Sequence, residues 1–295
     1  MKTAISALDE RTARTDDVEV EVWSRPRERS LFGRELHRWS ARNSSKGSLL
    51  RESVKCLEFL AEGRSIAELY RAVRDWNLLG KRTRETRRAC WRLISWRYFT
   101  PTEGPVAVAL SALARRGSDD LVFRGALYFH FCLADRLTFD VATEFLWDLQ
   151  RKGREIVSPT EVKTFIRDQV SAHPEVLRWS ESTLHRLSGN VLSALRDFGR
   201  LSGEAKKRLV QPPLPDELLL YVCKFLSTEG ASARAIVTAP EFRLWGRDPR
   251  EIGARLAQLS RSGAIRFEWS GDIAILDLGE ETFDAYARRI GGEVR

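Results

Sequence analysis

The chain has 295 residues, of which 43% are hydrophobic and 31% are charged, and it contains only 19 glycines and 10 prolines. This composition excludes a disordered or fibrous protein and is enough for roughly two domains of about 100 to 200 residues each. Lys and Arg number 49 against 41 Asp and Glu, and the resulting net charge of +8 favours an anionic partner such as nucleic acid or a membrane surface.

The charge divides the chain into three parts. Residues 1–22 carry a net charge of −3, which indicates an acidic tail, and residues 212–295 carry −2, so that residues 23–211 hold +13. The proline-rich run at 211–215 resists helix continuation and predicts a linker. The predicted organisation is an acidic tail and basic arm (1–45), an N-terminal helix-turn-helix module (46–115), a helical domain with a second helix-turn-helix (116–211) and a C-terminal winged-helix domain (212–295).

The first module is predicted to contain three short helices. Apolar residues recur with a 3.6-residue period from Gly47 to Gly63, which predicts the first helix. Ser65 and Glu68 form the spacing of a capping box that starts the second helix, which carries Leu69, Val73, Trp76 and Leu79 as apolar residues. Thr83 or Thr86 then caps a third helix that continues toward Phe99.

The next hundred residues are predicted to be helical as well. Residues 106–150 are predicted to form two apolar helices, the second starting near Thr138. Charged residues within 121–149 favour a buried helical hairpin over a membrane-spanning one. A second, weaker helix-turn-helix pattern follows, with predicted helices at 160–170 and 182–198 separated by a break at His173-Pro174.

The last 84 residues give the clearest pattern. Helices are expected at 218–226 and 231–237, and Asp248, Pro249 and Glu251 form the start of a third helix that ends at Gly263. Two alternating apolar segments about a Ser-Gly-Asp turn then predict a β-hairpin at 265–276, before a final helix at 281–290. Three helices followed by a hairpin indicate a winged helix. The expected fold class is therefore mainly α, with helix-turn-helix and winged-helix modules.

The strongest candidate site is the basic segment 81–97, which has seven bases and one acid, Glu85. It covers the start of the predicted third helix, where a helix-turn-helix presents its recognition helix to the DNA major groove. Arginine guanidinium groups bind phosphates and guanine edges, and threonine hydroxyls suit phosphates. The predicted DNA-binding residues are Lys81, Arg82, Thr83, Arg84, Thr86, Arg87, Arg88 and Arg92. The competing interpretation is a solvated charged face on which Glu85 pairs with arginines.

Two further basic segments are candidates. Six arginines between 25 and 42 surround Trp23, Phe32 and Trp39, and they form either an arm along the phosphate backbone or a segment in which Trp39 docks on the core. In the second helix-turn-helix, the additional candidate DNA contacts are Arg178, Ser180, Ser182, Arg186, Lys206 and Lys207, with His185 and Arg208 beside them.

No enzyme signature occurs. The sequence lacks the glycine-rich nucleotide loops, the zinc-protease motif and the hydrolase elbow, so no catalytic residue or cofactor is expected. His130 lies close to Cys132, but the two lack further ligands, which favours a core role over a metal site. Four cysteines without a C-x-x-C pair read as buried thiols in a reducing cytoplasm, and they are Cys56, Cys90, Cys132 and Cys223.

The pattern resembles the BrxA family of bacterial BREX phage-defence islands. The similarity lies in the helix start at 51–53, the segment Trp76-Asn77-Leu78-Leu79-Gly80-Lys81-Arg82-Thr83 with the Arg-rich helix after it, and the terminal pattern from 239 to 268 with its hairpin. It covers roughly residues 45–278. The resemblance implies a mainly helical, non-enzymatic DNA-binding component that serves defence alongside a methyltransferase, an ATPase and a phosphatase-like protein.

The predicted function is therefore double-stranded DNA binding in phage defence, without a membrane. Five to seven phosphate contacts predict that log K falls against log salt with a slope of about −5 to −6. An RNA-binding protein, a transcription regulator and a protein-interaction scaffold are the alternatives. The C-terminal winged helix, which is nearly neutral, is expected to hold a protein partner or to brace the first module.

Overall fold

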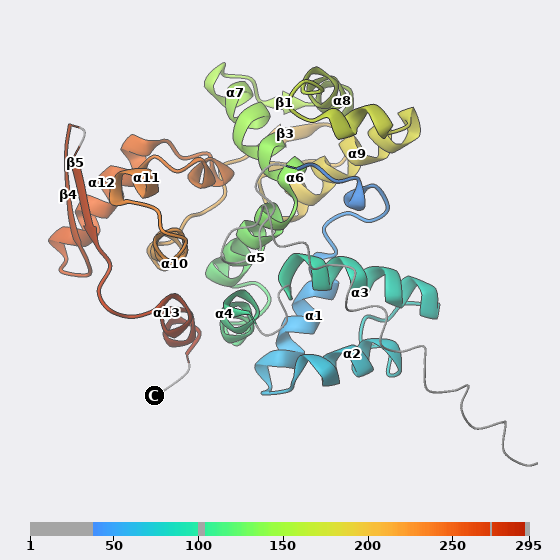
Figure 1. Ribbon diagram of the computed structural model, residues 1–295, viewed down its shortest axis with the longest axis horizontal. Helices are drawn as coiled ribbons and strands as arrows, with labels where there is room; N and C mark the ends of the chain where they lie inside the picture. The colour runs from blue at the N-terminus through green and yellow to red at the C-terminus, as the bar shows by residue number, and fades with distance from the viewer. Residues whose placement is uncertain (1–37, 100–103, 272, 293–295) are drawn as a thin grey trace, which may run out of the picture.

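The computed structural model describes residues 38–99, 104–271 and 273–292, and it is mainly helical (Figure 1). The strands in these residues form two small antiparallel sheets, one of three strands and one of two. The predicted mainly α fold class is confirmed. The predicted acidic tail and most of the basic arm, including Trp23 and Phe32, lie outside the described residues.

The first three helices follow the predicted pattern closely. They are α1 (Leu50–Ala61), α2 (Ile66–Arg74) and α3 (Arg84–Tyr98). Ser65 and Glu68 form the predicted capping box, since the serine hydroxyl accepts from the Glu68 amide and the glutamate accepts from the Ser65 amide at 2.8 Å. Thr83, rather than Thr86, caps α3 by accepting a hydrogen bond from the Thr86 amide at 3.1 Å.

Trp76 contradicts its predicted place on the apolar face of the second helix, because its side chain is 65% exposed. The helix α2 ends at Arg74, and Asn77 turns the chain with a positive φ of 54°. The 3.6-residue period therefore stops before Trp76 is reached, and the tryptophan lies on the turn between α2 and α3.

The apolar region contains one helix more than predicted. The structure has α4 (Pro105–Ala114), α5 (Leu121–Ala134) and a third segment of α6 (Arg136–Asp140), a π-helical turn (Val141–Phe145) and α7 (Leu146–Arg151). Asp120 caps α5, and Asp135 caps α6 in place of a start near Thr138. These aspartates compete for helix amides and so interrupt a continuous apolar pattern. Within the described residues, no helix is long and apolar enough to cross a membrane.

A central unit follows, with both predicted helices and a sheet that was not predicted. It comprises β1 (Ile156–Val157), α8 (Pro159–Asp168), a 3-10 turn (Pro174–Arg178), α9 (Glu181–Asp197), β2 (Leu201–Ser202) and β3 (Lys207–Leu209). The strand order is β1-β3-β2, and both pairings are antiparallel. Strands of two or three residues are too short to give a recognisable alternation in sequence.

The C-terminal elements appear in the predicted order. They are α10 (Asp216–Thr228), α11 (Ala233–Val237), a 3-10 turn (Pro240–Trp245), α12 (Pro249–Arg261), β4 (Arg266–Ser270), β5 (Ile273–Asp277) and α13 (Phe283–Ile290). The predicted capping box of Asp248 and Glu251 is present, and β4 pairs with β5. The last helix starts two residues later than predicted, because Thr282 caps it.

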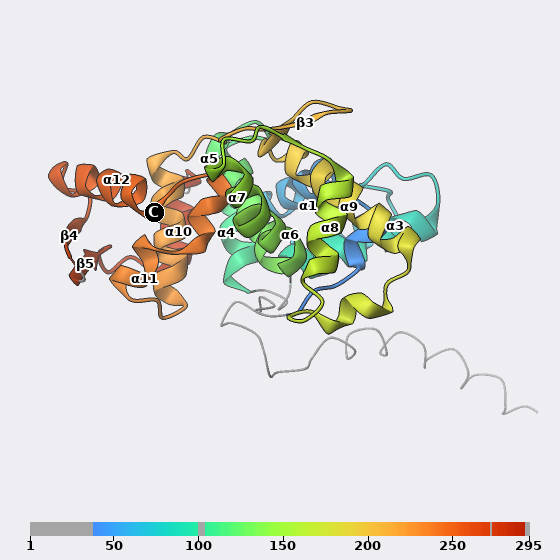
Figure 2. The same ribbon diagram turned by 90° about the horizontal axis from the view of Figure 1, so that it is seen from above.

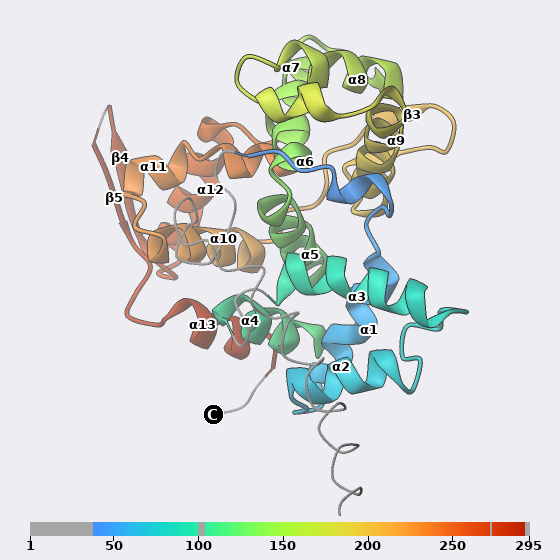
Figure 3. The same ribbon diagram turned by 45° about the vertical axis from the view of Figure 1, so that its right-hand side comes forward.

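These parts share one continuous hydrophobic core. Figures 1 and 3 show α4 and α13 side by side where the two halves of the chain meet. The helix α13 lies along α4, and α10 lies against α5, so the C-terminal elements are packed on the first half of the chain. At this contact, the His130 ring of α5 and the Tyr221 hydroxyl of α10 are 2.7 Å apart and hydrogen-bonded. Figure 2 places α3 and α9 toward one end of the molecule and α12 with the hairpin at the other.

Candidate nucleic-acid interface

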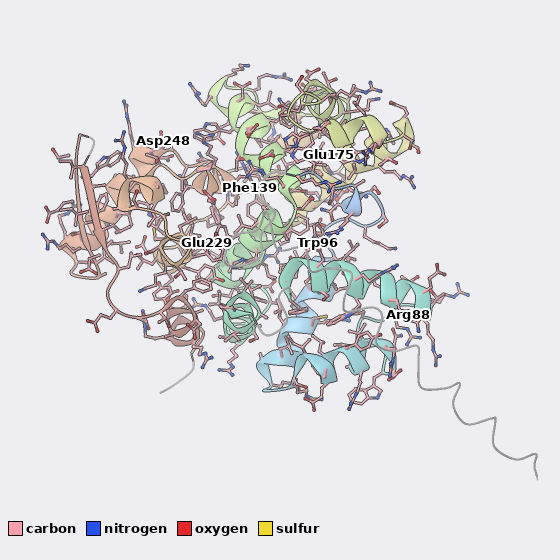
Figure 4. All side chains as sticks on the ribbon, in the orientation of Figure 1. Arg88, Trp96, Phe139, Glu175, Glu229 and Asp248 are labelled. Atoms are coloured by element: carbon pink, nitrogen blue, oxygen red, sulfur yellow. The ribbon has the colours of Figure 1, made fainter. Side chains whose placement is uncertain are left out.

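The outward face of α3 presents a row of arginines. Arg84, Arg88 and Arg92 recur every fourth residue and all three are exposed, as the predicted shared face requires. Arg82 is exposed just before the helix. Figure 4 shows Arg88 at the outer edge of the molecule, while Trp96, two turns further on, lies toward the interior. The basic and apolar faces of this helix are thus separated.

The ion pairs of the described residues leave these four arginines out. Within the residues that the structure describes, none of them forms an ion pair with a carboxylate, and Glu85 pairs with none of them. Asp75, at the preceding turn, is held by Arg74 instead at 2.9 Å. The pKa of Asp75 is lowered by that hydrogen bond and by the charges of Arg84 and Arg87. A positive field therefore surrounds the start of α3.

Other predicted contacts at this end have partners within the protein. Lys81 is ion-paired with Glu52 of α1, and both side chains are partly buried. One guanidinium nitrogen of Arg87 donates to the Arg74 carbonyl at 2.8 Å. The Thr83 and Thr86 hydroxyls are 2.9 Å apart in the helix cap. These residues fix the turn between α2 and α3, and Arg82, Arg84, Arg88 and Arg92 are the more accessible part of the predicted set.

Arg97, counted among the seven bases of the segment, is buried and points away from the arginine row. It is 4% exposed and donates to the Ser48 carbonyl at 2.6 Å, to the Gly47 carbonyl at 2.8 Å and to the Asn43 side chain at 2.5 Å. Arg97 follows the buried Leu93 and Ile94 by four and three residues, so the helical period places it on the apolar face. That spacing is a signal that a count of charges overlooks.

The described end of the basic arm docks on the protein. The Trp39 side chain is 2% exposed, stacks on His173 with ring centroids 3.8 Å apart, and donates from Nε1 to Asp140 at 2.8 Å. Arg42 lies over the Trp96 ring at 4.8 Å, and Arg38 is exposed. The docking interpretation is confirmed for Trp39, while the arginines from 25 to 34 lie outside the described residues.

The second set of candidate contacts gathers around α9 and the β2–β3 turn. Ser180 caps α9, and Ser182, His185 and Arg186 line a shallow, open hollow with Glu181. Arg178 and Lys206 are exposed. Lys207 is instead buried, since its ammonium donates to the carbonyls of Gly203 at 2.9 Å and Glu204 at 2.7 Å and so holds the turn.

The titratable core groups have structural roles. The predicted burial of all four cysteines is confirmed, and burial raises the pKa of Cys223 to about 12. His130 lies among aromatic rings, and burial lowers its pKa to about 3, so the ring is neutral near pH 7. Among the described residues, no group of three or more His, Cys, Asp or Glu side chains could hold a metal ion.

Two asparagines with structural contacts were not predicted: Asn43, which is buried, and Asn190, which is partly buried. Asn43 precedes α1 and contacts Asp135, Arg97 and Asn190, while Asn190 lies beside the apolar stripe of α9. Only the position of Asn190 next to buried Leu187 and Val191 hints at such a role in the sequence. The hydrogen bonds of Asn43 join residues that are far apart in the chain, so local spacing in the sequence does not reveal them.

Comparison with known proteins supports both the fold and a family. An uncharacterized protein from Magnetospirillum magneticum, known from a crystal structure, shares 20% sequence identity with a TM-score of 0.52, over 65% of this chain and 95% of that one. At this identity the likeness concerns the fold alone. No curated protein matches. The BrxA family model matches residues 37–224, which is more than half of the chain. The protein therefore belongs to the BrxA family, which implies involvement in BREX phage defence.

Proposed function

We propose that this protein is a non-enzymatic component of BREX defence that binds double-stranded DNA through the N-terminal half of α3. The observation that carries the proposal is the exposed row of Arg84, Arg88 and Arg92, with exposed Arg82 just before it. Among the described residues, none of the four is ion-paired with a carboxylate. Arginine forks suit phosphates and guanine edges, which makes a nucleic acid the favoured partner.

The arrangement of α2 and α3 supports duplex DNA in particular. A short helix, a turn and a longer capped helix form the order of a helix-turn-helix, whose second helix enters the major groove with its N-terminal end. The major groove of B-form DNA admits an α-helix, whereas that of A-form RNA is too narrow and deep. An RNA-binding role is accordingly the less favoured alternative.

The salt dependence expected for this module is smaller than the charge count alone suggests. Arg97 is buried and Lys81 is ion-paired, so neither is counted as a phosphate contact. Four phosphate contacts from Arg82, Arg84, Arg88 and Arg92 correspond to a slope of log K against log salt of about −4. This slope is the one expected when α3 alone contacts the DNA.

The C-terminal part is proposed to be a winged helix that meets a protein. The order α10, α11, α12, β4, β5 supports that fold. Its hairpin exposes Trp269 (38%), Ile273 (71%) and Ile275 (42%), and its net charge of −2 is a poor match for DNA. Exposed apolar side chains favour a protein surface, and the resemblance implies the methyltransferase, the ATPase or the phosphatase-like component as candidates.

The test is a binding titration with fluorescently labelled duplex DNA, duplex RNA and single-stranded DNA of the same sequence, across a salt series. Duplex DNA is expected to bind most tightly. A preference for RNA or for single strands would overturn the choice of ligand. Absence of binding to all three at low salt would favour a protein-interaction scaffold, and high affinity for one defined operator alone would favour a transcription regulator.

A further inference from the structure

The central unit has the connectivity of a complete winged helix. Its elements run α7, β1, α8, α9, β2, β3, and the last strand lies between the other two in the sheet. In this arrangement α8 and α9 form the helix-turn-helix, and the turn between β2 and β3 forms the wing. The helix α9 therefore corresponds to α3 as the helix that a helix-turn-helix presents to DNA.

The exposed surface of this unit suits phosphates. Arg178 precedes α9, Arg186 lies just over one turn inside it, and Lys206 lies in the wing directly before β3, all three exposed. The carboxylate of Glu181 at the helix start is shared by Lys163, at 2.7 Å, and Arg167, both from α8. Because Lys163 and Arg167 of α8 neutralise the Glu181 carboxylate, this carboxylate repels a phosphate at the start of α9 less than an unpaired carboxylate would.

Two buried residues of the segment before α1, Asn43 and Ser48, join the two helices. The Asn43 side chain accepts a hydrogen bond from Arg97 of α3 at 2.5 Å and donates one to Asp135 at 2.6 Å. The backbone carbonyl of Asn43 accepts a hydrogen bond from the Asn190 side chain of α9 at 2.8 Å. Ser48, on the same segment, bonds both helices as well, since its carbonyl accepts from Arg97 at 2.6 Å and its hydroxyl donates to Asp197 at 2.6 Å.

The two helices point their basic ends to the same side of the molecule. In Figure 2 the N-terminal ends of α3 and α9 both lie at the right, and Figure 1 shows both at the edge opposite α12 and the hairpin. The bonds to residues 43–48 lie behind these ends, at the C-terminal part of α3 and in the second half of α9. Arg84, Arg88 and Arg186 thus lie toward the N-terminal ends of two helices whose later parts are both bonded to residues 43–48 in the interior.

From these contacts we infer a second DNA-binding surface, formed by the start of α9 and the β2–β3 wing, which Asn43 holds at a fixed distance from α3 so that one continuous duplex meets both. This inference rests on the proposed function, since it requires α3 to bind duplex DNA. Asn43 and Asn190 are positioning residues, because they contact the helices and not the DNA.

Two rigidly joined surfaces have measurable consequences. Once one surface is bound, the other meets the same duplex at high effective concentration, which raises affinity by about 10²- to 10⁴-fold over one surface alone. Three further phosphate contacts, from Arg178, Arg186 and Lys206, bring the salt slope from about −4 to about −6. A duplex of about one helical turn, 10 base pairs, is expected to span only one of the two surfaces.

The experiment compares duplexes of about 10 and about 24 base pairs, of one and two helical turns, with the full chain. Native mass spectrometry is expected to find two short duplexes or one long duplex per protein. Arg178→Glu/Arg186→Glu removes the second surface and is expected to weaken long-duplex binding by about 10²- to 10⁴-fold. The same change should reduce the number of bound short duplexes from two to one.

Asn190→Ala tests the fixed distance, since it removes the bond to the Asn43 carbonyl and leaves the Asn43 side chain's bonds in place. Long-duplex affinity should fall toward that of a short duplex, while both short-duplex sites and thermal stability are retained. Unchanged long-duplex affinity in this variant would overturn the role of Asn43. Asn43→Ala provides the second variant, judged by the same short-duplex control.

The outcomes separate this inference from the proposed function. If wild type binds long and short duplexes equally, and Arg178→Glu/Arg186→Glu has no effect, the second surface does not exist but α3 binding stands. If wild type binds no duplex of either length, the proposed function fails and the inference fails with it.

Discussion

Arg97 and Asn43 form a buried hydrogen bond in which the arginine Nη2 lies 2.5 Å from the amide Oδ1. The helix α3, which exposes Arg84 and Arg88, is thus anchored to the rest of the protein by Arg97. The Arg97 guanidinium also lies over the Phe131 ring, 4.6 Å from its centroid. Burial lowers the pKa of Arg97. One basic segment therefore has two roles, contact at its start and anchoring at its end.

The anchoring role predicts a large cost for Arg97→Ala. The substitution leaves the carbonyls of Gly47 and Ser48 and the side chain of Asn43 without their donor. It also removes the positive charge near buried Asp135. We expect a loss of about 3–5 kcal/mol in the free energy of unfolding, as for other broken buried charge networks. Urea denaturation followed by circular dichroism measures it.

The matched control is Arg92→Ala, on the exposed face of the same helix. Its free energy of unfolding should lie within about 0.5 kcal/mol of wild type, as is usual for surface substitutions. Equal stability of the two alanine variants would contradict the assigned role of Arg97.

The burial of a neutral His130 predicts that the folded protein loses stability as the pH falls. Burial lowers its pKa to about 3, while an unfolded histidine titrates near pH 6.5. Between these values the unfolded chain binds a proton that the folded protein does not, so stability falls as the pH drops below about 6.5. From pH 6.5 to 5, this group should cost about 2 kcal/mol.

The measurement compares wild type with His130→Gln across this pH range, because the difference between the two isolates one group from the other acids and histidines. The stability advantage of wild type, measured by urea denaturation, should shrink as the pH falls. A difference that stays constant from pH 7 to 5 would show that His130 does not titrate as described.

Two glycines in helices predict opposite effects of the same change. Gly125 of α5 lies against Leu218 of α10, and an added Cβ would overlap the leucine methyl group. We expect Gly125→Ala to cost about 1–3 kcal/mol by overpacking. Gly189 of α9 has open space around it, so Gly189→Ala should stabilise the protein by about 0.5–1 kcal/mol. Thermal denaturation of both variants checks the pair, and a stabilising Gly125→Ala would contradict the packing of α10 on α5.

The buried cysteines predict protection from alkylation. Burial raises the pKa values of all four thiols, Cys56, Cys90, Cys132 and Cys223. The thiolate is the reactive species, so iodoacetamide at pH 8 should modify the native protein very slowly and the urea-unfolded protein at all four positions. Peptide mass spectrometry gives the sites. Rapid modification of any of the four in the native protein would place that thiol at the surface.

The sequence predicts local features of this protein well. Helix starts at Ser65, Thr83 and Asp248 follow from capping chemistry that depends on residues three positions apart. The β4–β5 hairpin follows from alternation about a turn. The exposed row of Arg84, Arg88 and Arg92 follows from the helical period alone.

Features that depend on distant contacts were beyond such patterns. The helical spacing places Arg97 on the apolar face, but its hydrogen-bond partners come from residues 43–48, about fifty positions earlier in the chain. The ion pair that occupies Lys81 comes from Glu52 of another helix. The three-stranded sheet joins β1 to β3 across some fifty residues, and neither strand is long enough to show a period. These are properties of packing and not of local spacing.

The measurement that tests the central claim most directly is the binding of a labelled 24-base-pair duplex DNA to Arg84→Glu/Arg88→Glu, compared with Arg250→Glu/Arg261→Glu. The second variant makes the same change in net charge on exposed arginines of α12, at the opposite end of the molecule (Figure 2). With both variants folded as judged by circular dichroism, the α3 variant should bind the duplex about 10²- to 10⁴-fold more weakly than wild type, and the α12 variant should bind it with nearly wild-type affinity. Equal loss in the two variants, or wild-type binding by the α3 variant, would contradict recognition of DNA by α3.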